Sequence, residues 1–486
     1  MSDIIYPTLD LFLYDLRDGL GENTGEIADN QAGFARKLPE RIHSLIVQQD
    51  VTVEAEYVEL LGNRGREQFD SSSQKYTLKG FYYPVRLGDS YGLLLDCSVE
   101  HSLGHPERSK TEACPVSCLA DLKTELDRRL AGQPSTIGQV WMISGQIPNF
   151  TPDKAEAIAQ ACCQVPELDL DWNRDFRGKS EFMGGMLFEL WRYRFKRPDN
   201  SSSSASSPIR NIHQLQDNHC VLIALYPDQE TAKKASQFNF DWLRLFAYRS
   251  KILWAYGQSQ YLRKNLKDDF VAIKQYIKDF NQAQTRRLNL KKLRQTLVDA
   301  QNTLSNYSIN LNYLNTQKRT IEVNLLNYRR RLYRIKQRLT DFQAATELEF
   351  LKQFGDDVER RDLLQVQSDY ESFSPGLTLL GDLINSIRGV TEIDQAERDR
   401  NFQEIVAIFG VGLAAGALAA SSAEQFPGMS DPKEVVEYPV RSVLSQLGVS
   451  EAWLPPAILA TVSLGITVIF ALLTALVIKL SWLFRR

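Results

Sequence analysis

One long apolar stretch near the C-terminus limits what this chain can fold into. Residues 455–480 carry a single charged side chain, Lys479, near the end of the stretch. A helix needs roughly 20 apolar residues to cross the hydrocarbon core of a bilayer, and this stretch is longer. Trp453 and Trp482 flank it, as aromatic residues do at membrane interfaces. The stretch predicts a transmembrane helix, so we expect an integral membrane protein in contact with lipid.

A second, less hydrophobic segment at residues 402–423 predicts another span, with a buried soluble helix as the alternative. Three small residues recur in it at every fourth position and share one helix face. Such faces let transmembrane helices approach closely. No strand precedes the glycines, so they do not form a nucleotide-binding loop. The candidate pore or helix-packing residues are Gly410, Gly412, Gly416 and Ala420.

The distribution of Lys and Arg near the spans predicts their orientation. Basic residues lie outside the two span ends that must share a side, whereas the connecting loop 424–454 offers only Lys433 and Arg441. We therefore expect both termini in the cytosol and the loop outside. The loop is net acidic, and its candidate site residues are Glu424, Asp431, Glu434 and Glu437.

Length and charge narrow the remaining possibilities. The chain has 486 residues, enough for two or three units with separate cores. Its net charge of −3 gives no support for a nucleic-acid partner. The first residues have no basic stretch followed by an apolar core, so we expect no secretory signal. All six cysteines lie in the first half, which we expect in the cytosol with reduced thiols.

Residues 1–227 predict a cytosolic α/β domain. A serine-rich loop at 198–208 lies within it and is too polar to bury a core. Residues 76–99 predict a hairpin that turns at Gly88-Asp89-Ser90. Alternating or β-rich runs predict further strands at 9–17, 140–144, 184–195 and 219–227, and apolar periodicity predicts helices at 34–46, 115–130 and 152–163.

Residues 228–400 predict a helical coiled coil and stalk, followed by a membrane domain at 401–486. Leucine occupies every heptad a position from 290 to 339 except Lys318, a pattern typical of a coiled coil. The amphipathic segment 229–285 is its expected antiparallel partner. Gly355 and the Ser374-Pro375-Gly376 sequence predict helix breaks, after which 377–400 continues into the first span.

Two clusters of side chains are candidate sites. His101, His105, Cys114 and Cys118 are imidazole and thiol ligands of the kind that zinc prefers, although their spacing fits no common zinc finger. A loop and a helix start with incidental thiols are the alternative.

The second cluster is a basic patch on the long helix, Arg329, Arg330, Arg331 and Arg334. It predicts either an anion-binding surface or a solvated helix face that pairs with the acidic residues following it. The chain has no GxSxG, HExxH or phosphate-binding loop, and Gly19–Gly25 lacks the lysine of such a loop. We expect no enzymatic activity.

The order of these parts resembles the CorA family of divalent-cation channels across nearly the whole chain. In that family a cytosolic α/β domain precedes antiparallel helices, and a stalk helix runs into the first of two C-terminal spans. The resemblance implies a pentamer in a prokaryotic inner or plasma membrane, with a divalent cation as the candidate ion. The family's Gly-Met-Asn signature is absent, and the nearest match is Pro427-Gly428-Met429-Ser430. The loop is also longer than in the family, so magnesium does not follow from the resemblance.

These observations predict a homo-oligomeric ion channel or transporter gated by its cytosolic domain, since two spans per chain cannot enclose a pore alone. Some divergent members of the resembled family that lack the signature act as nucleotide-gated membrane effectors in prokaryotic defence, which is one alternative that the resemblance implies. The other is a non-conducting tether whose coiled coil positions a binding domain.

Overall fold

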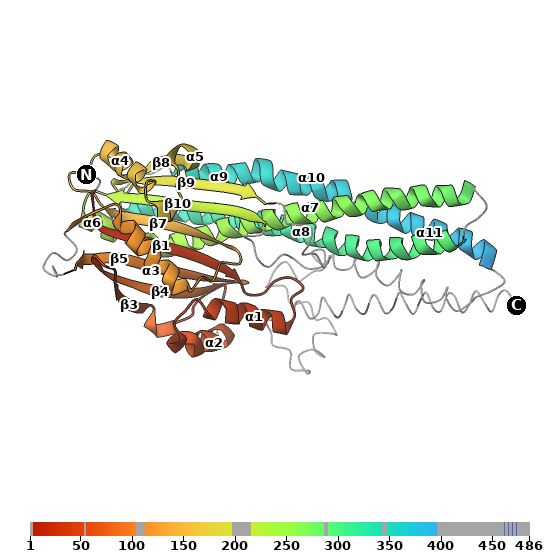
Figure 1. Ribbon diagram of the computed structural model, residues 1–486, viewed down its shortest axis with the longest axis horizontal. Helices are drawn as coiled ribbons and strands as arrows, with labels where there is room; N and C mark the ends of the chain where they lie inside the picture. The colour runs from red at the N-terminus through yellow and green to blue at the C-terminus, as the bar shows by residue number, and fades with distance from the viewer. Residues whose placement is uncertain are drawn as a thin grey trace. The chain divides into compact units, whose positions relative to one another are not determined.

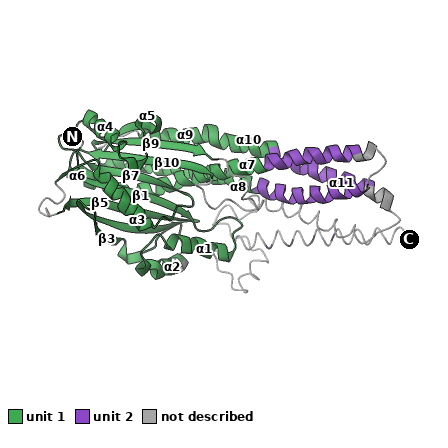
Figure 2. Ribbon diagram, viewed as in Figure 1, with its two compact units in different colours: residues 1–265, 313–372 green, residues 266–312, 373–486 purple. Residues whose placement is uncertain are grey.

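The computed structural model describes residues 3–52, 55–103, 112–196, 215–285, 290–342 and 348–395, together with the single residues Thr461, Gly465, Ile469 and Leu473. The chain divides into two compact units (Figure 2). The first contains residues 1–265 and 313–372, and the second contains residues 266–312 and 373–486. The two longest helices contribute residues to both units.

A mixed β-sheet forms the centre of the first unit (Figure 1). Its strand order is β2-β4-β5-β1-β7-β10-β9-β8, with β3 paired to β4 and β6 paired to β1. Among the described strands only β7 and β10 pair in parallel. The strands are β1 (Asp3–Leu16), β2 (Tyr57–Glu59), β3 (Glu67–Ser72), β4 (Tyr76–Leu87), β5 (Ser90–Ser102), β6 (Ala113–Pro115), β7 (Gly138–Gln146), β8 (Phe176–Phe182), β9 (Gly185–Phe195) and β10 (Gln216–Tyr226).

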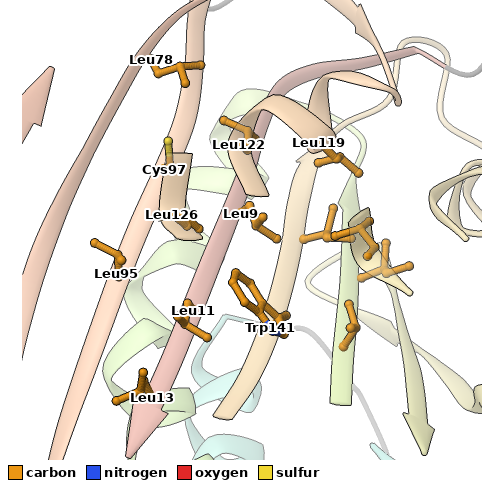
Figure 3. Packing of buried hydrophobic residues seen from close by; sticks show 14 of the residues in the cluster. Leu9, Leu11, Leu13, Leu78, Leu95, Cys97, Leu119, Leu122, Leu126 and Trp141 are labelled. Carbon is orange, nitrogen blue, oxygen red and sulfur yellow. The ribbon is translucent and has the colours of Figure 1, made fainter. Parts of the chain in front are cut away.

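Short helices pack on one face of this sheet and complete a hydrophobic core. Side chains alternate between the faces of a strand, so Leu9, Leu11 and Leu13 of β1 point to the same side. Three leucines of α3 at helical spacing, Leu119, Leu122 and Leu126, pack against them (Figure 3). The short helices of this unit are α1 (Thr24–Ala35), α2 (His43–Thr52), α3 (Cys118–Leu130), α4 (Pro152–Cys162), α5 (Trp172–Asp175) and α6 (Gln229–Ala235), with 3₁₀ turns η1 (Glu40–Ile42), η2 (Gly62–Arg64), η4 (Pro166–Leu168) and η6 (Ser236–Phe238).

The opposite face of the sheet packs against the first half of a long helix, α7 (Asn239–Thr285). Phe12 meets Phe246 edge-on with 5.2 Å between ring centroids. The Tyr14 hydroxyl donates a hydrogen bond to the Leu243 carbonyl at 2.6 Å. Because Phe12 and Tyr14 alternate with the core leucines, strand β1 contacts the short helices on one face of the sheet and α7 on the other.

The helix α7 pairs with a still longer helix, α8 (Leu290–Asp341), and the pairing is antiparallel. The two helices contain 47 and 52 residues, which is about 70 and about 78 Å of helix. In the first unit Asp241, near the start of α7, pairs with Arg331 and Arg338 near the end of α8. In the second unit Tyr276 of α7 hydrogen-bonds Thr303 of α8 at 3.1 Å.

The buried side of α8 contains a polar stripe beside its apolar seam. Thr296, Thr303, Asn310, Gln317 and Asn324 recur every seven residues, and each is less than 9% exposed. Partners on α7 account for two of them, since Tyr276 bonds Thr303 and Asp269 bonds Asn310. The stripe therefore helps to fix the register of the pair.

A third helical run follows α8. It consists of α9 (Glu349–Asp357), a π-helical turn η7 (Val358–Leu363), α10 (Leu364–Phe373) and α11 (Pro375–Gln395). In the second unit the Tyr307 hydroxyl of α8 donates to the Phe373 carbonyl at 2.6 Å. Phe270 of α7 meets the Phe373 ring edge-on. Three helices therefore pack together in this unit.

The fold confirms the predicted N-terminal α/β domain followed by long paired helices, and it corrects two details. The predicted helix at 34–46 is wrong, because the chain breaks at Pro39 between α1 and α2. Gly355 does not break a helix: it lies within α9, where buried Leu351 and Phe354 hold the helix against its neighbours. Such packing outweighs the roughly 1 kcal/mol that glycine costs inside a helix. The predicted break at Ser374 is confirmed as the one-residue gap between α10 and α11.

None of the helices in the described ranges combines the length and apolar character that a membrane crossing requires. The predicted span at 402–423, the loop at 424–454 and the serine-rich loop at 198–208 lie outside the described residues. Of the predicted span at 455–480, only Thr461, Gly465, Ile469 and Leu473 are described, each in helical conformation.

Candidate functional site

A buried ion pair joins the sheet to the long helices in the first unit. Arg249 of α7 is 1% exposed, and its guanidinium pairs with the carboxylate of Glu189 on β9, which is 2% exposed. The guanidinium also lies 4.8 Å from the ring centroid of Trp191 on β9 and 4.4 Å from that of Phe354 on α9. Arg249 thus connects β9, α7 and α9 within one cluster.

The helix α8 joins the same cluster through Tyr328. Its hydroxyl donates a hydrogen bond to the Leu351 carbonyl of α9 at 2.8 Å. Its ring lies 5.2 Å from that of Phe354. A displacement of β9 would therefore press on three helices at once, because close-packed side chains transmit strain. We call this cluster of Glu189, Arg249, Tyr328 and Phe354 the Arg249 junction.

Two arginines of the predicted basic patch, Arg329 and Arg331, form ion pairs with acidic side chains. Arg329 pairs with Asp356 at 3.0 Å and with Glu359 at 2.8 Å. Arg331 pairs with Asp241 at 3.1 Å. Arg329 thus pairs with acids that follow the patch in the sequence, whereas the partner of Arg331 is an acid of α7 that the sequence interpretation did not name. Arg330 and Arg334 are exposed.

A pair of carboxyl groups, of which Asp10 is buried and Asp96 is partly buried, lies on the face of the sheet that packs against α7, and the sequence pattern did not predict it. Asp10 of β1 and Asp96 of β5 are directly opposite in the strand register. Burial raises the pKa of Asp10 well above its ordinary value, and Asp96 raises it further. Burial also raises the pKa of Asp96 to about 6. Two carboxylates this close cannot both be charged at low cost, so the folded state favours a pair in which one of the two carboxyl groups holds a proton.

Arg66 moderates the charge of this carboxyl pair and lowers both pKa values. Its guanidinium lies 4.3 Å from the ring centroid of Phe81. A signal was available in the sequence, since Asp10 interrupts a run of apolar residues. The partner could not be found, because Asp96 becomes a neighbour only through the pairing of β1 with β5.

The predicted zinc ligands do not form a metal site within the described residues. His101 lies near the end of β5, Cys114 lies in β6, and Cys118 is the first residue of α3. No group of three or more His, Cys, Asp or Glu side chains suitable for a metal is found in the described ranges. Burial raises the pKa of the Cys114 thiol to about 11 and that of Cys118 further, which disfavours the thiolate that zinc binds. His105, the fourth predicted ligand, lies outside the described residues.

The remaining predicted site residues cannot be placed. The small residues Gly410, Gly412, Gly416 and Ala420 and the acidic residues Glu424, Asp431, Glu434 and Glu437 lie outside the described ranges. Comparisons with protein families, with curated proteins and with solved structures found no match to this chain.

Proposed function

We propose that the chain is one subunit of a homo-oligomeric ion channel or transporter, in which a cytosolic α/β domain gates two C-terminal transmembrane helices. Two apolar segments follow α11 in the sequence, at 402–423 and 455–480. Ile469 and Leu473 are 55% and 49% exposed on helical backbone. Exposed apolar side chains on a helix suit a lipid environment.

The Arg249 junction is the observation that carries the gating part of the proposal. A gating domain must transmit its state to the helices that lead to the membrane. The junction provides such a connection, because a buried pair of opposite charges cannot separate without leaving a charge unpaired in the core. The sheet, the first half of α7 and the second half of α8 should therefore move as one body.

The alternative function, a non-conducting tether, requires something different of the long helices and the two predicted spans. A tether needs the helices to hold a binding domain at a distance, and it does not need a pore between subunits. Ion flux separates the two functions directly.

The test is ion flux through purified full-length protein in liposomes, comparing the wild type with Gly416→Leu. Gly416 lies on the small-residue face of the first predicted span, and a leucine there adds bulk where helices should meet. We expect the wild type to conduct and Gly416→Leu to lose most of the flux while still inserting. The matched control is Val411→Phe, which also adds bulk but at a position about 140° around the same predicted helix from Gly416 and about 100° from Gly410. Absence of flux from the wild type in sealed liposomes would reject the channel proposal.

A further inference from the structure

A small cavity lies in the first unit where a loop of the sheet domain meets both long helices. Its volume is about 140 Å³. The loop that precedes α1 lines one side, and Asp89 at the β4–β5 turn lines another. Lys251 and Trp254 of α7 and the stretch of α8 from Tyr313 to Thr320 complete the lining. Four segments far apart in the sequence therefore surround one space.

The loop fits closely against α8 at one glycine. Gly21 has a φ of +85°, and a Cβ on it would lie 2.6 Å from the Tyr313 hydroxyl oxygen. The left-handed conformation favours glycine there, and any larger residue would also displace the Tyr313 side chain. The glycine-rich loop Gly19–Gly25 thus forms one side of this cavity.

The lining is strongly acidic. It contains the carboxyl groups of Asp18, Glu22, Glu26 and Asp89 and a single ammonium group, that of Lys251, which pairs with Asp89. Burial raises the pKa of Asp18, the charge of Arg17 opposes this rise, and the charges of Asp89 and Glu22 add to it. The carboxylates therefore repel one another across the space, and a cation between them would relieve that repulsion.

A buried acceptor on the lining provides a second and independent sign of a ligand. Gln317 is only 4% exposed, and among the described residues its Oε1 atom has no hydrogen-bond partner. Asn310 and Asn324, one heptad away on either side of the same stripe, both have partners. Buried polar atoms are nearly always satisfied, so the unpaired oxygen indicates a missing donor.

The arrangement of acceptor groups on the lining favours an organic cation over a bare metal ion. No group of three or more His, Cys, Asp or Glu side chains in the described ranges is close enough to hold a metal. Hydrogen bonds from an ammonium group to separate acceptors need no such cage. The aromatic side chains of Trp254 and Tyr313 on the lining also suit an organic cation.

We propose that this cavity binds a small organic cation that carries ammonium groups, with Gln317 and Asp18 among its acceptors. The binding does not depend on the ion flux proposed above and can be measured without it. If the protein is a gated channel, the ligand is the signal that its gating domain senses, because it contacts the loop, α7 and α8 together.

The probe is putrescine, titrated calorimetrically into full-length protein in detergent. We expect saturable binding at one site per chain, which magnesium chloride at matched ionic strength does not displace. Butanediol has the same carbon chain with hydroxyl groups in place of ammonium groups and should not bind. The proposal is overturned if putrescine gives no binding heat, if butanediol binds equally well, or if magnesium displaces the amine.

Two variants locate the site, and one matched variant controls for general damage. Gln317→Leu and Asp18→Asn should each weaken putrescine binding about tenfold or more, because each removes a charge-assisted or buried acceptor. Asn324→Leu changes the same polar stripe away from the lining and should bind like the wild type. Should Gln317→Leu fail to fold, Asp18→Asn on the half-buried loop carries the test alone. Wild-type affinity in Asp18→Asn would place the amine elsewhere and reject the proposal.

Discussion

The paired carboxyl groups of Asp10 and Asp96 make the stability of the α/β domain depend on pH. When the pKa of an aspartate rises on folding, the folded state keeps its proton at pH values between the unfolded and the folded pKa, where the unfolded chain has already released it. The folded state therefore loses stability as the pH rises from the ordinary value of 3.8 through about 6, the raised pKa of Asp96. Asp10, whose pKa is also raised well above its ordinary value, adds a loss of its own as the pH rises, and both losses are absent below 3.8.

Replacing Asp10 by asparagine should remove most of this pH dependence. An amide resembles the protonated carboxyl group that the folded state prefers, so Asp10→Asn should stabilise the protein by about 1–3 kcal/mol at pH 8 and change little at pH 4. Thermal melting across this pH range measures the effect. Asp70→Asn, on the exposed side of β3, serves as the control. Equal destabilisation of Asp10→Asn at every pH would contradict the shared-proton account.

The ion pair of Arg249 with Glu189 should respond differently to single and double substitution. Arg249→Met leaves the Glu189 carboxylate buried without its partner and should cost about 3–5 kcal/mol. Adding Glu189→Leu removes that stranded charge and should recover much of the loss. Unfolding free energies in denaturant decide this, and strictly additive losses would show that the two side chains do not act as a pair.

Sequence reasoning identified the apolar seam of α8 but not its polar stripe. The a and d residues are recognisable because leucine repeats along one short stretch of chain. The buried state of Thr303 and Asn310 depends on Tyr276 and Asp269, which lie more than 25 residues away on another helix. Polar side chains on a helix are usually exposed, so their burial could not be read from periodicity alone. The break at Pro39 was missed for a related reason, since the apolar pattern continues across it.

The seam itself is tested by two substitutions at a positions of α8. Leu325 is 4% exposed, and Leu325→Asp places a charge in the core, so the melting temperature should fall sharply. Lys318 is 23% exposed and pairs only loosely with Glu322, at 3.9 Å. Lys318→Leu should therefore be neutral or stabilising. Melting temperatures that moved the opposite way in both variants would refute the register.

At the scale of the whole molecule, the sequence predicted the order of the parts, and the fold confirms its first two. Local patterns were sufficient for this, because strand alternation and heptads need only neighbouring residues. The Arg249 junction, the carboxyl pair and the cavity at Gln317 each bring together segments from distant parts of the chain. Their positions follow from the pairing of strands and the packing of helices on the sheet, which no local pattern specifies.

The central claim is that several copies of the chain surround a pore, and the mass of the detergent-solubilised particle tests it most directly. Light scattering with the detergent contribution subtracted gives the number of chains per particle. The account predicts at least three chains, and five by the architectural resemblance, because two spans from each chain must together enclose a path. A homogeneous monomer or dimer in mild detergent, with its unfolding transition intact, would contradict the channel and leave the tether as the function.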